Sequence, residues 1–92
     1  MLSPLIQDTA RPEIVTLCLS NLSPGQSGKV ACLQGSRAFT RQLLRMGLSP
    51  GTTLRLIRRA PLGDPLHFAA GNFELSLRKS TAQHIQVELL EE

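Results

Sequence analysis

The stretch "LLRMGLSPGTTLRLIRRAPLGDP", residues 43–65, decides how this chain folds. It starts with the apolar spacing of a helix, passes through a proline-glycine turn, and continues with Leu54 and Leu56 alternating with polar residues, as in a half-buried strand. Ile57 breaks the alternation, which predicts either a bulge or a strand partly covered on both faces. The stretch ends in 61–65, where two prolines would remove ladder donors from a strand, so this segment is predicted to connect two strands.

A short helix is predicted upstream of the turn. Between Ser36 and Met46 the period is helical, and the apolar stripe on one face consists of Phe39, Leu43, Met46 and, widening it, Leu44. Ser36 is a suitable N-cap, and Gly47 is a suitable C-terminal stop. The pattern therefore predicts one helix between two strands.

Four further runs alternate between apolar and polar positions. They lie around Val30 and Cys32, at 66–70, at 73–78 and at 85–89, and a Gly-Asn pair joins the middle two runs as a hairpin. Residues 79–83 allow one helical turn. Five short strands with one helix between the first and second predict a mainly β fold, a small antiparallel barrel whose closure would hide the sheet edges.

Composition is that of one small globular domain. Of 92 residues, 41% are hydrophobic and 18% are charged, which suffices for a core and is unlike a disordered chain. With no Trp or Tyr and three Phe, the core is expected to be aliphatic. The same shortage argues against an aromatic-lined groove for proline-rich peptides and against stacking of single-stranded nucleic acid.

The chain is predicted to have two parts and to be cytoplasmic. Residues 1–16 contain two prolines and no sustained period, which predicts a flexible N-terminal extension before a domain at 17–92. No basic start precedes an apolar run, and no segment approaches the roughly 20 apolar residues that span a bilayer, so neither a signal peptide nor membrane insertion is expected. Cys18 and Cys32 are expected to be reduced, buried and structural.

Three segments resemble the FeoA family, the small cytoplasmic component of bacterial ferrous iron uptake. They are "LSNLSPGQSGKV" at 19–30, the opening stretch at 43–65, and "LSLRKSTAQHIQV" at 75–87. The resemblance implies an SH3-like β-barrel that works beside FeoB, a membrane permease with a cytoplasmic GTP-binding domain, as an accessory or regulatory partner without enzymatic activity. A related domain is appended to metal-dependent repressors of the diphtheria toxin repressor type. The longer N-terminus and the two cysteines depart from the family pattern.

The loop at 61–65 is a candidate partner-binding site. It could present Leu62, Gly63, Asp64 and Pro65 on a rigid scaffold, as binding loops often do. It could equally be a plain turn in which Gly63 takes a positive φ and Asp64 accepts hydrogen bonds from neighbouring amides. Both interpretations can hold together.

The predicted helix is the second candidate. Arg37, Arg41 and Arg45 recur every four residues, so each adjacent pair of like charges costs roughly 0.2–0.5 kcal/mol. The row can be a solvated face, can meet an acidic protein, or, with the arginines at 55, 58 and 59, can attract phosphates. We assign Arg41, Arg45 and Met46 to the partner-binding set.

Metal and catalytic sites are not expected. His67, His84, Cys18 and Cys32 are scattered over four segments with no ligand pair at close spacing, and both histidines fall on the outward phase of their predicted strands, where they should be solvated. No GxSxG, Walker or HExxH pattern occurs, and no nucleophile has a base at a recognisable spacing. We expect no cofactor and no hydrolysis of GTP by this domain.

The sequence thus favours a non-enzymatic accessory or regulatory protein of ferrous iron uptake that binds a FeoB-type permease, through its GTP-binding domain or a membrane-proximal region. Weak self-association is left open. The alternative is a nucleic-acid-associated or repressor accessory domain, which the arginines and the repressor analogy support.

Overall fold

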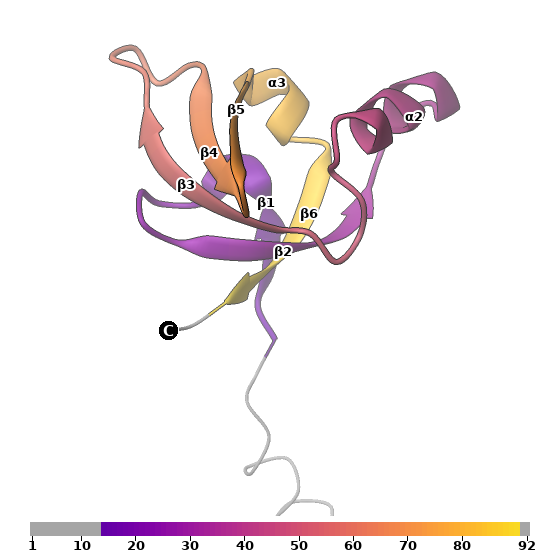
Figure 1. The fold of residues 1–92 in the computed structure, drawn as a ribbon, viewed down its shortest axis with the longest axis horizontal. Helices are drawn as coiled ribbons and strands as arrows, with labels where there is room; N and C mark the ends of the chain where they lie inside the picture. The colour runs from indigo at the N-terminus through magenta and orange to yellow at the C-terminus, as the bar shows by residue number, and fades with distance from the viewer. Residues whose placement is uncertain (1–13, 91–92) are drawn as a thin grey trace, which may run out of the picture.

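The computed structural model describes residues 14–90, and Figure 1 shows a strongly curved sheet with helices at one end. The elements are β1 (Thr16–Cys18), the 3-10 helix η1 (Leu19–Asn21), β2 (Ser27–Leu33), α2 (Arg37–Arg45), β3 (Thr53–Arg59), β4 (Leu66–Ala70), β5 (Phe73–Leu77), α3 (Lys79–Ala82) and β6 (Ile85–Leu90). The predicted extension at 1–16 lies outside the described residues except for its last three positions, and Thr16 begins a strand.

The strands of residues 14–90 form one six-stranded antiparallel sheet in the order β1-β6-β2-β3-β4-β5. The mainly β fold, the five predicted strands, the helix between the first two of them and the Gly71-Asn72 hairpin are confirmed. The sixth strand, β1, has three residues, too few for a period of two to be visible in the sequence.

The expectation of a closed barrel is wrong for the described part of the chain. β1 and β5 stand at the two ends of the strand order and each pairs on one side alone. The chain leaves the sheet at Leu77 and enters α3 at Lys79, and no pairing between β5 and β1 occurs among residues 14–90. Among residues 14–90, the sheet therefore keeps a free edge along β5.

Two bulges increase the curvature of the sheet. In β3 the register passes from Leu56 to Arg58, so Ile57 is the extra residue, and the predicted break of alternation is a bulge. In β2 the register passes from Val30 to Cys32 in the same way. Because side chains alternate with a period of two, a bulge moves the residues after it to the opposite face.

The core is aliphatic, as its composition predicts. Phe68 is the single aromatic residue of the buried cluster. The other members are Leu19, Leu22, Val30, Leu43, Leu48, Leu54, Leu56, Leu66, Ala70, Leu77, Ala82, Ile85 and Val87. The cluster draws on β2 to β6, η1 and the two helices, so it fixes the helices to the inner face of the sheet.

Local signals define both ends of α2. The Ser36 hydroxyl accepts a hydrogen bond from the Phe39 amide at 3.1 Å, which confirms the N-cap. Gly47 has φ 91°, and the Leu48 amide donates to the Leu43 carbonyl at 3.1 Å, the pattern of a Schellman C-cap. Both predicted helix boundaries are confirmed.

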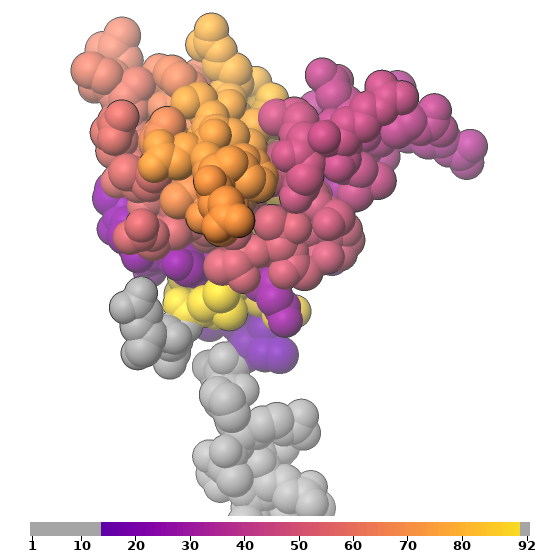
Figure 2. Space-filling model, in the orientation of Figure 1, coloured from indigo at the N-terminus to yellow at the C-terminus, as the bar shows by residue number. Residues whose placement is uncertain are grey.

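The apolar stripe of α2 is only partly in the core. Leu43 is buried and Phe39 half-buried, whereas Leu44 is 46% and Met46 38% exposed. Figures 1 and 2 show that α2 extends beyond the body formed by the strands, so part of the helix surface stays away from the core.

Candidate functional site

The loop at 61–65 connects β3 to β4, as predicted, and its tip faces solvent. Leu62 is 96% exposed, and Gly63 has φ 86°, the positive value expected of it. The Gly63 amide donates to the Ala60 carbonyl at 2.7 Å, and the Ala60 amide donates to the Pro65 carbonyl at 3.0 Å. These bonds hold the loop in one shape with an exposed leucine at its tip.

Asp64 acts differently from the expectation. Its Oδ1 accepts a hydrogen bond from the Lys79 amide at 2.8 Å, and its Oδ2 lies 3.9 Å from a guanidinium nitrogen of Arg78. The carboxylate therefore bonds the start of α3, fifteen residues on, rather than neighbouring amides. This contact depends on the β4–β5 hairpin, which returns the chain to the loop, so local sequence gives no sign of it.

The arginines divide into two groups. Arg37, Arg41 and Arg45 are exposed on α2, and within residues 14–90 the ion pairs are His67 with Glu74 and Arg78 with Asp64. Arg59 points inward, where its guanidinium donates to the carbonyls of Ser20 at 3.1 Å and Leu22 at 2.6 Å. Arg59 is thus engaged in structure rather than free for phosphates.

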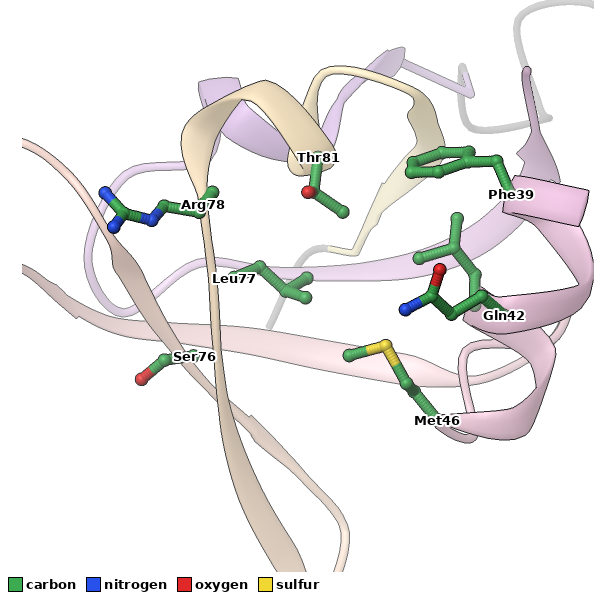
Figure 3. Close-up of a pocket in the computed structure, with 8 residues that line it drawn as sticks. Phe39, Gln42, Met46, Ser76, Leu77, Arg78 and Thr81 are labelled. Carbon is green, nitrogen blue, oxygen red and sulfur yellow. The ribbon is translucent and has the colours of Figure 1, made fainter. Parts of the chain in front are cut away.

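A cleft of about 260 Å³ lies between α2, β5 and α3 (Figure 3). Its lining residues are Phe39, Gln42, Leu43, Met46, Ser76, Leu77, Arg78 and Thr81. Figure 3 shows Gln42, Met46 and Leu77 directed into the space, while the side chains of Ser76 and Arg78 point away from it. Ser76 and Arg78 therefore present mainly their backbone to the cleft.

Of the predicted partner-binding residues, Met46 alone lines this cleft. The other seven lining residues were missed, and three of them, Phe39, Gln42 and Leu43, share with Met46 the face of α2 that carries the predicted apolar stripe. The helical spacing of these α2 residues is the signal in the sequence that could have found them. It shows which residues share a face but not that the helix stands off the sheet.

α2 meets its neighbours at both ends of the cleft. Near its first turn, the Phe39 ring packs edge-on against His84, with 5.2 Å between ring centroids. Just after its last turn, a Cβ added to Gly47 would lie 3.4 Å from Cζ of Phe73. The cleft between these contacts has an apolar floor and one side-chain amide, that of Gln42.

Both histidines depart from the expectation of simple solvation. His67 Nδ1 lies 3.1 Å from Ser76 Oγ, and its Nε2 lies 2.9 Å from Glu74 Oε1. His84 precedes β6 instead of lying on a strand, and its Nδ1 is 3.0 Å from the Ser80 carbonyl. Both rings are tied into the fold by contacts that the outward phase of a strand does not reveal.

Ser76, His67 and Glu74 lie together and contain a nucleophile, a base and an acid, which their sequence spacing did not indicate. The question is therefore whether they could form a catalytic site. Acyl transfer also requires oxyanion donors and a substrate site beside the hydroxyl. The Ser76 side chain points away from the cleft (Figure 3), and His67 faces Ser76 across the β4–β5 ladder. The contacts fit a cross-strand link between β4 and β5.

The two cysteines are not both buried. Cys18 is half-buried, and its Sγ lies 3.5 Å from Nε2 of Gln86. Cys32 is exposed, which corrects the expectation of a structural core cysteine. The bulge between Val30 and Cys32 reverses the phase of β2, so Cys32 no longer shares the buried face of Val30.

Residues 14–90 contain neither a cluster of metal ligands nor a helix that could span a membrane. No three or more His, Cys, Asp or Glu side chains in this range are grouped as a metal site would require. No helix among these residues is long and apolar enough to cross a membrane.

The sheet and its helices define a small SH3-like domain whose surface features are a cleft under α2 and an exposed loop tip. A family model, the FeoA domain, matches residues 17–89, and the chain belongs to the FeoA family. The resemblance inferred from the sequence motifs is thereby confirmed.

Three relatives illustrate the match. The chain is 33% identical over 72 residues to an Fe(2+) transport protein A/Fe(2+) transporter FeoB fusion protein of Porphyromonas gingivalis, covering 78% of this chain and 8% of that protein. A FeoA protein from Chlorobium tepidum has a TM-score of 0.75 at 33% identity, covering 82% of this chain and 71% of that one. Stenotrophomonas maltophilia FeoA, solved with zinc and described as a procaryotic SH3 domain protein, has a TM-score of 0.67 at 29% identity, covering 77% and 88%.

Proposed function

We propose that this chain is a non-enzymatic accessory or regulatory domain of bacterial ferrous iron uptake that binds a FeoB-type permease in the cytoplasm. The observation that carries the proposal is the fused relative, in which a segment similar to this chain and an Fe(2+) transporter share one polypeptide. A short tether raises the effective concentration of two modules to about the millimolar range, an arrangement that suits domains that act on each other.

The proposed contact combines the loop tip and the outer part of α2. Leu62 offers an exposed apolar side chain, and Arg41 and Arg45 offer exposed cations. Met46 continues the helix surface towards the cleft. Gly63, Asp64 and Pro65 shape the loop, with Asp64 anchoring it to α3. A partner surface with carboxylates around an apolar patch would complement this set.

Binding alone can account for regulation. A domain that binds one state of the permease more tightly than another shifts the population toward that state by its differential affinity. The permease then supplies any nucleotide chemistry, and this chain only shifts the balance between the states of the permease.

Co-purification with the full-length permease tests the proposal. We expect Leu62→Asp and Arg45→Asp each to abolish co-purification, because one places a charge in the apolar contact and the other reverses a complementary charge. Arg55→Asp, at an exposed arginine of the sheet, is the matched control and should bind as wild type. If both test variants still bind, Leu62 and Arg45 are not part of the interface. If the wild-type chain does not bind, the permease is not its partner.

The alternative of a nucleic-acid or repressor accessory role loses Arg59 from its set of cations, because this guanidinium donates to backbone carbonyls, while the arginines at 37, 41, 45, 55 and 58 stay exposed. A titration with duplex DNA at low and at moderate salt should give no binding. Salt-sensitive binding would favour the alternative.

A further inference from the structure

β5 is an edge strand with unused backbone groups. Within residues 14–90 it pairs with β4 alone, and the two-residue turn makes Ala70 and Phe73 the closing hydrogen-bonded pair of the hairpin. By the alternation of an antiparallel ladder, the amide and carbonyl groups of Glu74 and Ser76 then face away from β4. Outside the strand ladders, no backbone hydrogen bond of residues 14–90 uses them. Such an edge is a template for another strand.

The cleft opens along this edge. β5 contributes Ser76 and Leu77 to one side, and α2 contributes Gln42 and Met46 to the other (Figure 3). The Gln42 amide carries both a donor and an acceptor, the same pair that a peptide group presents. Leu77, Met46 and the buried Leu43 provide an apolar floor. Backbone bonding on one side and a side-chain pocket beside it are the elements of recognition by β-strand addition.

Charge around the cleft selects the kind of segment that fits. None of the eight lining residues is acidic. Arg41 and Arg45 are exposed and adjoin Gln42 and Met46 on α2, whereas the Arg78 side chain points away from the cleft (Figure 3) and lies beside Asp64. A segment that carries carboxylates beside an apolar residue is complementary to these cations. A second copy of this chain would instead bring a second set of the same cations to the seam, which is repulsive.

We propose that an extended, acidic segment of the partner adds to β5 as a seventh strand and places one apolar side chain in the cleft under α2. The proposal rests on the proposed function, because it takes the permease as the source of the segment. It goes further by naming the recognition mode and moving the centre of the contact from the loop tip to the edge of β5.

A pair of substitutions at one position isolates the backbone bond. Ser76→Pro removes an amide that faces away from β4 and is tolerated at an edge, whereas Ser76→Ala keeps that amide and removes only the hydroxyl beside His67. In titrations of the full chain into detergent-solubilised permease, Ser76→Pro should weaken binding by at least about tenfold, a change typical of a central interface contact. Ser76→Ala should bind within about threefold of wild type, the effect of a peripheral contact.

A second pair tests the pocket. Met46→Arg fills the cleft with a charged side chain, and Leu44→Arg makes the same change at an exposed position of α2 outside the cleft lining. The first should weaken binding at least about tenfold and the second should leave it near wild type. If the amide NMR spectrum shows that Ser76→Pro is unfolded, the comparison of Met46→Arg with Leu44→Arg is the test of the proposal.

The outcomes separate the two proposals. If the wild-type chain binds and the folded Ser76→Pro and Met46→Arg variants bind equally well, strand addition is wrong while the permease remains the partner. If the wild-type chain does not bind the permease, both proposals fall. If the chain alone is a dimer by light scattering and Ser76→Pro makes it a monomer, the occupant of the edge is a second copy, and the proposal is overturned.

Discussion

At the scale of single residues, Asp64 holds the candidate loop in place from within. The first amides of a helix lack partners inside the helix, and the N-cap of α3, Arg78, makes no side-chain cap bond. The Asp64 carboxylate supplies that acceptor from a distant loop. One hydrogen bond thus holds the loop and supplies a partner for an amide at the start of α3. The α3 helix in turn contributes Thr81 to the cleft.

Removing the Asp64 carboxylate should loosen this connection. We expect Asp64→Ala to lower the free energy of unfolding by about 1 kcal/mol, the usual cost of losing a helix cap, measured by urea denaturation. Asp64→Asn keeps an acceptor oxygen and should cost clearly less. Equal stability of the alanine variant and the wild type would show that the bond contributes nothing.

Gly28 is the position where a single added methyl group has no room. A Cβ there would lie 2.8 Å from Cγ2 and 2.9 Å from Cβ of Val87 on the paired strand. Gly28→Ala should therefore lower the free energy of unfolding by about 1–3 kcal/mol, the range for overpacking. In a double-mutant cycle, Val87→Ala should relieve part of that cost, because it removes the clashing atoms. Strictly additive effects would exclude the steric explanation.

At the scale of elements, α2 decides whether a cleft exists. Its two ends follow from local sequence, because Ser36 and Gly47 are chemically suited to their positions and are confirmed there. Its distance from the sheet could not be predicted, since it depends on how Leu43, Phe39 and His84 pack in three dimensions. The cleft could not be predicted from the sequence for the same reason, because its residues come from separate elements that only the three-dimensional packing brings together.

Weakening the start of α2 should destabilise the helix wall of the cleft while the core of the sheet stays stable. We expect Ser36→Ala to cost about 1 kcal/mol locally and to speed hydrogen exchange of the α2 amides, while amides of the central strands keep their protection. Ser36→Asp retains the acceptor and should restore slow exchange. A uniform loss of protection across β2, β3 and β6 would instead mean that α2 and the sheet unfold as one unit.

At the scale of the whole molecule, the sequence predicted what short-range periodicity encodes. Five strands and the hairpin turn are confirmed, and the break of alternation at Ile57 proves to be a bulge, one of its two predicted explanations, because each of these features leaves a mark within a few residues. Closure of the barrel and burial of Cys32 were wrong, because the first depends on where β5 ends in space and the second on a bulge without a sequence signature. The motifs identified the family, while the partner-binding role of Leu62, Arg41 and Arg45 stays a prediction.

We propose that this domain acts by binding the permease through the surface on the α2 and β5 side. The most direct measurement is an amide NMR titration of the isotope-labelled chain with unlabelled, detergent-solubilised permease. We expect saturable changes concentrated in α2, in β5 from Glu74 to Leu77, and in the loop at 61–65, with new protection of the Glu74 and Ser76 amides. Absence of any change at saturating permease, or changes confined to β1 and β6 on the opposite edge of the sheet, would contradict it.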